Sequence, residues 1–199
     1  NKGGNFVDVT AEVCPLLQNA GMVTDAAFSD YNKDGNIDLI LAGEFMPITV
    51  LENTGSTFEN RTETLGLSET TGLWNSIAVA DFDNDGDTDF VAGNIGLNTV
   101  LNSGQNKALK VDYADFDNNK RTETILATEK DGAYYTVANF DELSEQLVSI
   151  MRKKFTDYKS FAGKNIEEVF GEKLLNNATL LEVHTLTSGW LENENGKFK

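Results

Sequence analysis

Short apolar segments alternate with polar loops along most of the chain. Apolar stretches at residues 26–28 and 76–80 lead into acidic loops, and apolar stretches beginning at Leu39, Phe90 and Thr124 follow such loops directly. Segments of this length, bounded by Asn, Asp and Gly, are typical of β-strands. The stretches ITVLENTG (48–55) and NTVLNSG (98–104) are expected to be outer strands that end in turns. The pattern therefore predicts a mainly β structure.

One segment, about residues 139–177, follows a helical period instead. Its apolar residues recur at steps of three and four, as in an amphipathic helix: Leu143, Leu147, Ile150, Met151 and Phe155. Asn followed by Glu three positions later, at 139 and 142 and again at 165 and 168, is typical of a capping box at a helix start. We expect a small helical insertion here.

Self-comparison of the sequence indicates repeats. An Asn followed five residues later by Phe occurs at positions 1, 53 and 193, and a nine-residue acidic loop begins at Asp30, Asp81 and Asp115. A spacing near 50 residues fits one four-stranded propeller blade per repeat. We predict an all-β fold, part of a β-propeller, with about three four-stranded blades at residues 1–52, 53–102 and 103–199. The helical insertion falls in the third blade.

Charge and cysteine content narrow the function. The formal net charge is −16, which disfavours nucleic acid as a partner and favours dications. Cys14 is the single cysteine, so no disulfide forms within the chain, and a buried free thiol is expected. The apolar runs are too short to span a membrane, and the N-terminus lacks the pattern of a signal peptide.

The acidic loops have the composition of calcium sites, because Ca²⁺ takes six to eight oxygen ligands in flexible geometry. Alternate residues are expected to point inward, with a backbone carbonyl at the seventh position and a turning glycine, Gly35 or Gly86, at the sixth. The predicted ligands of loop 1 (residues 30–38) are Asp30, Asn32, Asp34, Asn36 and Asp38. Those of loop 2 (residues 81–89) are Asp81, Asp83, Asp85, Asp87 and Asp89.

A third acidic loop, loop 3 (residues 115–123), departs from this pattern. Its predicted ligand positions are Asp115, Asp117, Asn119, Arg121 and Glu123. Lys120 replaces the turning glycine, and Arg121 adds a second cation beside the site, so a third ion is expected to bind more weakly. In all three loops the twelfth position is apolar, which excludes an EF-hand and leaves the ninth residue as the closing ligand.

The loops and the strands around them resemble a known family. DYNKDGNIDLILAG, WNSIAVADFDNDGDTDFVAGNIGLN and MRKKFTDYKSFAGKNIEEVF are similar to FG-GAP or VCBS repeats of integrin α-like propellers, and most similar to bacterial ASPIC/UnbV-type proteins. The resemblance implies a propeller of about seven blades, extracellular or displayed at the cell surface, with Ca²⁺ between strands. The remaining blades would come from the same precursor or from another chain.

Three functions are consistent with these features. The first is a non-enzymatic binding, adhesion or scaffold module that contacts a protein or glycan and uses Ca²⁺ structurally. The second is a carbohydrate-active hydrolase or lyase, although His184 stands alone, and Trp74 and Trp190 fit blade packing better than sugar stacking. The third is an array of calcium loops like thrombospondin type 3 repeats or dockerins, which the strand after each loop disfavours.

Overall fold

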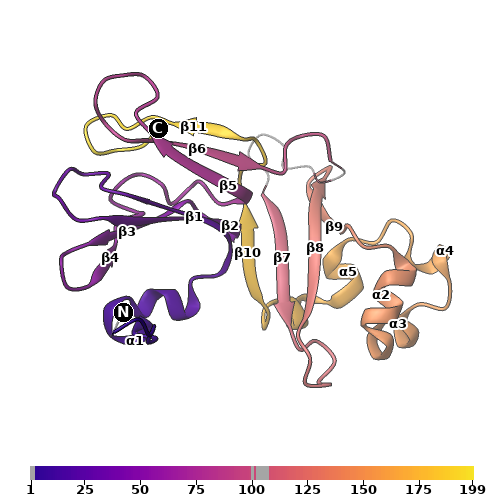
Figure 1. Ribbon diagram of the computed structural model, residues 1–199. Helices are drawn as coiled ribbons and strands as arrows, with labels where there is room; N and C mark the ends of the chain where they lie inside the picture. Colours follow the sequence, from indigo (N-terminus) through magenta and orange to yellow (C-terminus); the bar gives the residue numbers. More distant parts are fainter. Residues whose placement is uncertain (1–2, 100, 102–107) are drawn as a thin grey trace. The chain divides into compact units, whose positions relative to one another are not determined.

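The computed structural model describes residues 3–99, 101 and 108–199, and the chain forms two compact units (Figure 1). The first unit comprises Asn1–Asn98 together with Thr185–Lys199. The second unit comprises Thr99–His184. The mainly β fold with a few short helices is confirmed, and all strand pairing within the named strands is antiparallel.

The first unit contains two blade-like groups of strands. Blade 1 is a four-stranded meander of β1 (Met22–Ser29), β2 (Asp38–Met46), β3 (Thr49–Asn53) and β4 (Phe58–Asn60). Blade 2 consists of β5 (Gly72–Ala80), β6 (Asp89–Asn94) and β11 (Gly189–Leu191). Glu44 and Met46 of β2 pair with Leu73 and Gly72 of β5, which joins the blades.

The C-terminal segment completes blade 2. Leu191 of β11 pairs with Phe90 of β6, and an antiparallel bridge joins Asn193 to Phe198. Blade 1 shows the same arrangement, in which Leu51 pairs with Leu39 and Asn53 pairs with Phe58. The Asn–Phe spacing noted in the sequence therefore marks the turn after the third strand of a blade.

This arrangement differs from the predicted division into 1–52, 53–102 and 103–199. The C-terminal end of the predicted third blade lies in the first unit because its strand pairs with β6, and residues 99–184 are inserted between the second and third strands of blade 2. The sequence predicts that residues 98–104 form the outer strand next to β6, but β11 pairs with β6 instead. Most of that expected strand, residues 100 and 102–104, lies outside the described residues, as does Asn1.

An apolar core lies between the two blades. Ile40, Ala42 and Val50 of blade 1 pack in one cluster with Phe90, Ala92 and other residues of blade 2. The helices α1 (Thr10–Val13) and η1 (Pro15–Asn19) precede β1. The opposite face of blade 1 packs against Cys14, Leu17 and Ala20, and the thiol of Cys14 is buried there, as expected. Trp74 is also buried between the blades, which confirms its packing role, whereas Trp190 is 47% exposed.

The second unit is a four-stranded sheet covered by short helices (Figure 1). Its strand order is β10-β7-β8-β9, with β7 (Leu109–Ala114), β8 (Glu123–Lys130), β9 (Ala133–Thr136) and β10 (Thr179–Val183). The helices are α2 (Phe140–Gln146), α3 (Val148–Lys154), α4 (Tyr158–Phe161), α5 (Ile166–Phe170) and α6 (Glu172–Leu175). They follow β9 and precede β10, so a helical insertion interrupts this sheet, as predicted.

The helices begin where the sequence indicates. Asn139 and Asn165 form capping boxes with Glu142 and Glu168. The single amphipathic helix suggested by the apolar period divides into α2 and α3 at Leu147, whose backbone leaves the helical region (φ −123°, ψ 51°). Leu143 of α2 and Met151 of α3 still pack in one core with Phe116 and Ile125. Among the described residues, none of the helices has the length and apolar character needed to cross a bilayer.

Candidate metal centre

Loops 1 and 2 connect the first two strands of each blade and fold in the same way. The first Asp of each loop accepts a hydrogen bond from the backbone N–H at the sixth position: Asp30 from Gly35 (2.9 Å) and Asp81 from Gly86 (3.0 Å). Both glycines have left-handed backbones, at φ +89° and +94°, as predicted for the turn. The loops therefore bend over the first carboxylate.

The fourth position of each loop is a second left-handed residue that sequence reasoning missed. Lys33 has φ +60°, Asn84 +65° and, in loop 3, Asn118 +61°. Asn tolerates this conformation well, and its presence at two of the three positions was the available signal. Each loop therefore contains two left-handed residues, and in loops 2 and 3 the carboxylates of the first, third and ninth positions lie close together.

The ninth residue closes each loop, as predicted. Asp38 accepts hydrogen bonds from the N–H groups of Tyr31 (3.2 Å) and Asn53 (2.8 Å), while Asp89 accepts them from Phe82 (3.1 Å) and Asn193 (2.9 Å). Both carboxylates are buried. Each therefore ties its loop to the outer strand of the same blade. The role of Asn53 and Asn193 was missed in the sequence, although their shared spacing to Phe marked them.

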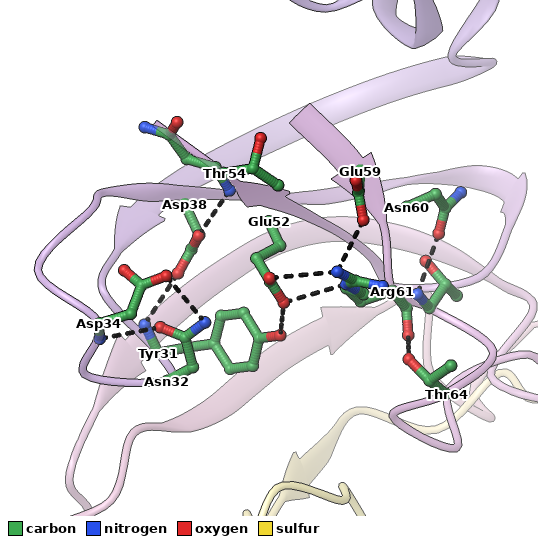
Figure 2. Close-up of polar contacts among 12 residues, drawn as sticks. Tyr31, Asn32, Asp34, Asp38, Glu52, Thr54, Glu59, Asn60, Arg61 and Thr64 are labelled. Atoms are coloured by element: carbon green, nitrogen blue, oxygen red, sulfur yellow. Dashed lines mark hydrogen bonds and ion pairs between the residues drawn. The ribbon is translucent and has the colours of Figure 1, made fainter. Parts of the chain in front are cut away.

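A polar network links Tyr31 of loop 1 to Glu52 of β3 and to Arg61 (Figure 2). The hydroxyl of Tyr31 donates to Oε2 of Glu52 (3.0 Å), and the Arg61 guanidinium donates to the same carboxylate (3.1 and 3.3 Å). Burial, followed by the hydrogen bond to Glu52, raises the pKa of Tyr31 well above its ordinary value. Tyr31 therefore stays neutral. The hydrogen bond of its hydroxyl to Glu52 helps to position Tyr31, whose backbone N–H donates to Asp38.

Carboxylates gather closely in loop 2. Oxygens of Asp81, Asp83 and Asp89 all lie within 4.8 Å of one another. The hydrogen bond from the Asp85 N–H lowers the pKa of Asp83, but burial and repulsion from the neighbouring carboxylates outweigh it and raise that pKa above 3.8. In loop 1 the residues at the first, third and ninth positions are Asp30, Asn32 and Asp38, which offer two carboxylates and one amide oxygen.

The sequence of loops 1 and 2 is similar to that of a repeat found in known proteins. Residues 30–92 match the family model of the FG-GAP-like repeat. This segment runs from the start of loop 1 to the middle of β6, so it includes both loops. The match supports the FG-GAP/VCBS resemblance, while the narrower likeness to ASPIC/UnbV-type proteins stays a prediction. No curated protein matches the sequence.

Two further predicted ligands of the FG-GAP-like segment, Asp34 and Asp85, accept hydrogen bonds from backbone N–H groups of their own loops. Oδ1 of Asp34 accepts from the Asn36 N–H (2.7 Å), and Oδ1 of Asp85 accepts from the Asp87 N–H (2.8 Å). The Asp87 carboxylate instead pairs with Lys33 Nζ of loop 1 (2.8 Å). The carbonyl role expected at Asn36 and Asp87 stays a prediction.

Loop 3 lies between β7 and β8 of the second unit and has the same form. Oxygens of Asp115, Asp117 and Glu123 lie within 4.8 Å of one another. Asp115 accepts from the N–H groups of Asn119 (2.9 Å) and Lys120 (2.8 Å). Lys120 adopts φ +68°, so the strain expected from replacing glycine is present. The predicted carbonyl position, Arg121, donates its N–H to Asn119 Oδ1 (2.7 Å).

Two further features of loop 3 concern Asp117 and the helices. Oδ2 of Asp117 accepts a hydrogen bond from the Ser149 hydroxyl of α3 (3.1 Å), a link that nothing in the sequence indicated. Oδ1 of Asp117 is buried and has no hydrogen-bond partner in the part of the chain that the structure describes. A buried carboxylate oxygen without a donor is unfavourable unless a cation neutralises it. The residues of loops 2 and 3 thus fit a hard cation held by oxygen ligands.

Proposed function

We propose that the chain is a calcium-binding, propeller-type module in which Ca²⁺ has a structural role. The observation that carries the proposal is the repeated closure of the loops, in which a buried ninth carboxylate holds both its own loop and the outer strand of the blade. Loop 2 would hold the ion through Asp81, Asp83 and Asp89, with Asp85 and Asp87 completing the set. Loop 1 would use the corresponding residues. An ion at such a loop would offset repulsion among carboxylates and fasten three strands together.

Thermal unfolding tests this proposal. Melting of the full chain is compared in chelator, in excess Ca²⁺ and in Mg²⁺, and Asp81→Asn is set against Asp131→Asn, which removes an exposed carboxylate at another turn. Calcium should raise the melting temperature by several degrees, Mg²⁺ should raise it less, and Asp81→Asn should reduce the gain. Equal melting temperatures in chelator and in Ca²⁺ would contradict the proposal.

An exposed apolar row on blade 2 supports a role in assembly with further blades. Ala78, Val91 and Trp190 are paired across β5, β6 and β11, and Val91 and Trp190 are 39% and 47% exposed. The residue of blade 1 that corresponds to Val91 is Ile40, which is fully buried against blade 2. We propose that another propeller blade, from the same precursor or another chain, covers this row.

We further propose that the module is a non-enzymatic binding, adhesion or scaffold element outside the cell, with a protein or glycan ligand. Loops of this type with affinities of about 10⁻⁴ to 10⁻³ M suit extracellular calcium concentrations. Carboxylate ligands around Ca²⁺ activate water far less than a zinc centre does, which favours a structural over a hydrolytic role. Hydrolysis of a glycan panel that is abolished by substituting one acid outside the loops would instead support an enzyme.

A further inference from the structure

A separate pocket lies within the second unit, between the sheet and helices α5 and α6. Its volume is about 480 Å³. Three acidic residues from three different elements line it: Asp112 of β7, Glu167 of α5 and Glu172 of α6. The apolar part of the wall includes Ile166, Leu175 and Leu180, and the polar residues Lys110 and Asn176 also line the pocket. The pocket thus combines negative charge with an apolar surface.

Asp112 is the most unusual group of this pocket. It is 5% exposed, yet its carboxylate makes no hydrogen bond or ion pair with any residue that the structure describes. It faces the helices because it pairs with Ile125 of β8 and Leu180 of β10, and Ile125 belongs to the core formed with the helices. A buried carboxylate without a partner is costly to keep charged.

Lys110 lines the same pocket but forms its ion pair with Glu182 and none with Asp112 among the described residues. Lys110, two positions earlier on the same face of β7, places its Nζ 3.6 Å from Glu182 Oε1 and 4.3 Å from the centre of the Tyr134 ring. Burial raises the pKa of Asp112; Lys110 lowers it and Glu167 raises it. The pocket therefore holds three carboxylates against the single ammonium group of Lys110, which leaves an excess of negative charge.

We propose that this pocket binds a small organic ammonium ion with an aliphatic body. The ammonium would lie against Asp112, and the aliphatic part would contact Ile166, Leu175 and Leu180. A metal ion is the poorer fit because Asp112, Glu167 and Glu172 are not among the close carboxylate groups in the described part of the chain, unlike those of loops 2 and 3. The apolar wall also favours an organic body over a hydrated ion.

Calorimetric titration of the calcium-saturated full chain with n-butylammonium tests the pocket. Saturable binding is expected, and n-butanol, which has the same apolar body without charge, should bind at least about tenfold more weakly. Asp112→Asn keeps the shape of the side chain and should weaken n-butylammonium binding on the order of tenfold. Asp131→Asn, which removes an exposed carboxylate of the same unit that does not line the pocket, should leave the affinity within about twofold.

A second variant keeps the test decisive if Asp112→Asn does not fold. Glu167→Gln changes an exposed helical residue and should weaken n-butylammonium binding about two- to fivefold. The proposal is overturned by an absence of saturable binding, by equal binding of n-butanol, or by unchanged affinity in both pocket variants. Displacement of n-butylammonium by further Ca²⁺ would also overturn it, because it would identify a metal site.

Discussion

The carboxylate of Asp89 accepts a hydrogen bond from the backbone N–H of Asn193 at 2.9 Å, joining residues 104 positions apart. Asp38 and Asn53 make the equivalent bond within blade 1, where 15 positions separate them. The side chains of the two Asn residues also make equivalent hydrogen bonds: Asn53 donates to the Ile37 carbonyl, and Asn193 donates to the Thr88 carbonyl. Blade 2 is thus built like blade 1 but is completed by the end of the chain.

The C-terminal segment should therefore contribute strongly to the stability of the first unit. Phe198 is 5% exposed, and its ring stacks on Phe90 with centroids 4.1 Å apart. Phe198→Ala should lower the free energy of unfolding by about 3–5 kcal/mol. Urea unfolding followed by tryptophan fluorescence reports this unit, because both tryptophans belong to it. The control Phe6→Ala changes a side chain that is 90% exposed, and a similar loss in both variants would contradict the argument.

Much of the fold was predictable from local pattern. The loops and the strands next to them follow from the Asp–Gly register and from apolar alternation, and the helix starts follow from Asn–Glu spacing. The pairing of β11 with β6 was not predictable from local pattern, because strand pairing across a long insertion leaves no local trace. The one distant sign was the Asn–Phe spacing shared by Asn53 and Asn193.

The candidate metal sites were predictable to a similar extent. The spacing identified the first, third and ninth positions, which the structure brings together in loops 2 and 3. The contact between Asp117 and Ser149 and the isolation of Asp112 depend on packing between distant segments. Such contacts cannot be derived from composition or spacing.

Lys33 of loop 1 should act as a tethered cation beside loop 2. Its Nζ contacts Asp87, and the hydrogen bond to Asp87 raises the pKa of Lys33, which keeps it charged. Lys33→Gln should strengthen calcium binding by loop 2 about two- to fivefold at low salt, with a smaller effect at high salt. Calcium titrations at two ionic strengths measure this, with Lys159→Gln of the second unit as the charge-matched control. Weaker binding in Lys33→Gln would refute the interpretation.

Placing glycine at the sixth position of loop 3, as in loops 1 and 2, should raise the stability and the calcium affinity of this loop. Lys120 has φ +68°, and Lys120→Gly removes both the strain and a positive charge. Stability should rise by about 0.5–1 kcal/mol, and calcium affinity should rise as well. Far-UV circular dichroism during urea unfolding follows the second unit, which contains α2 to α6. Asp131→Gly, compared with Asp131→Asn to separate the loss of charge, measures the relief of a left-handed backbone (φ +52°) outside the acidic loops. A destabilised Lys120→Gly would contradict the prediction.

The buried Asp112 should make stability depend on pH. Its pKa is raised above 3.8 in the folded chain, mainly by burial, so the folded state holds the proton more tightly than the unfolded state does. Protonated Asp112 therefore contributes to the free energy of unfolding in full below pH 3.8, and this stabilisation is lost as the pH rises through the raised pKa. Asp112→Asn should gain stability relative to the original chain across that window. Urea unfolding by circular dichroism between pH 4 and 8 measures the difference, and a difference independent of pH would disprove this assignment.

The most direct test of the central claim is a crystal structure grown in millimolar CaCl₂, with anomalous scattering recorded at a wavelength where calcium is visible. We predict a strong anomalous peak enclosed by Asp81, Asp83 and Asp89, a second in loop 1, and a weaker one beside Asp115, Asp117 and Glu123. A map with no peak at loops 1 and 2, with their carboxylates turned toward solvent, would contradict a calcium-bound module.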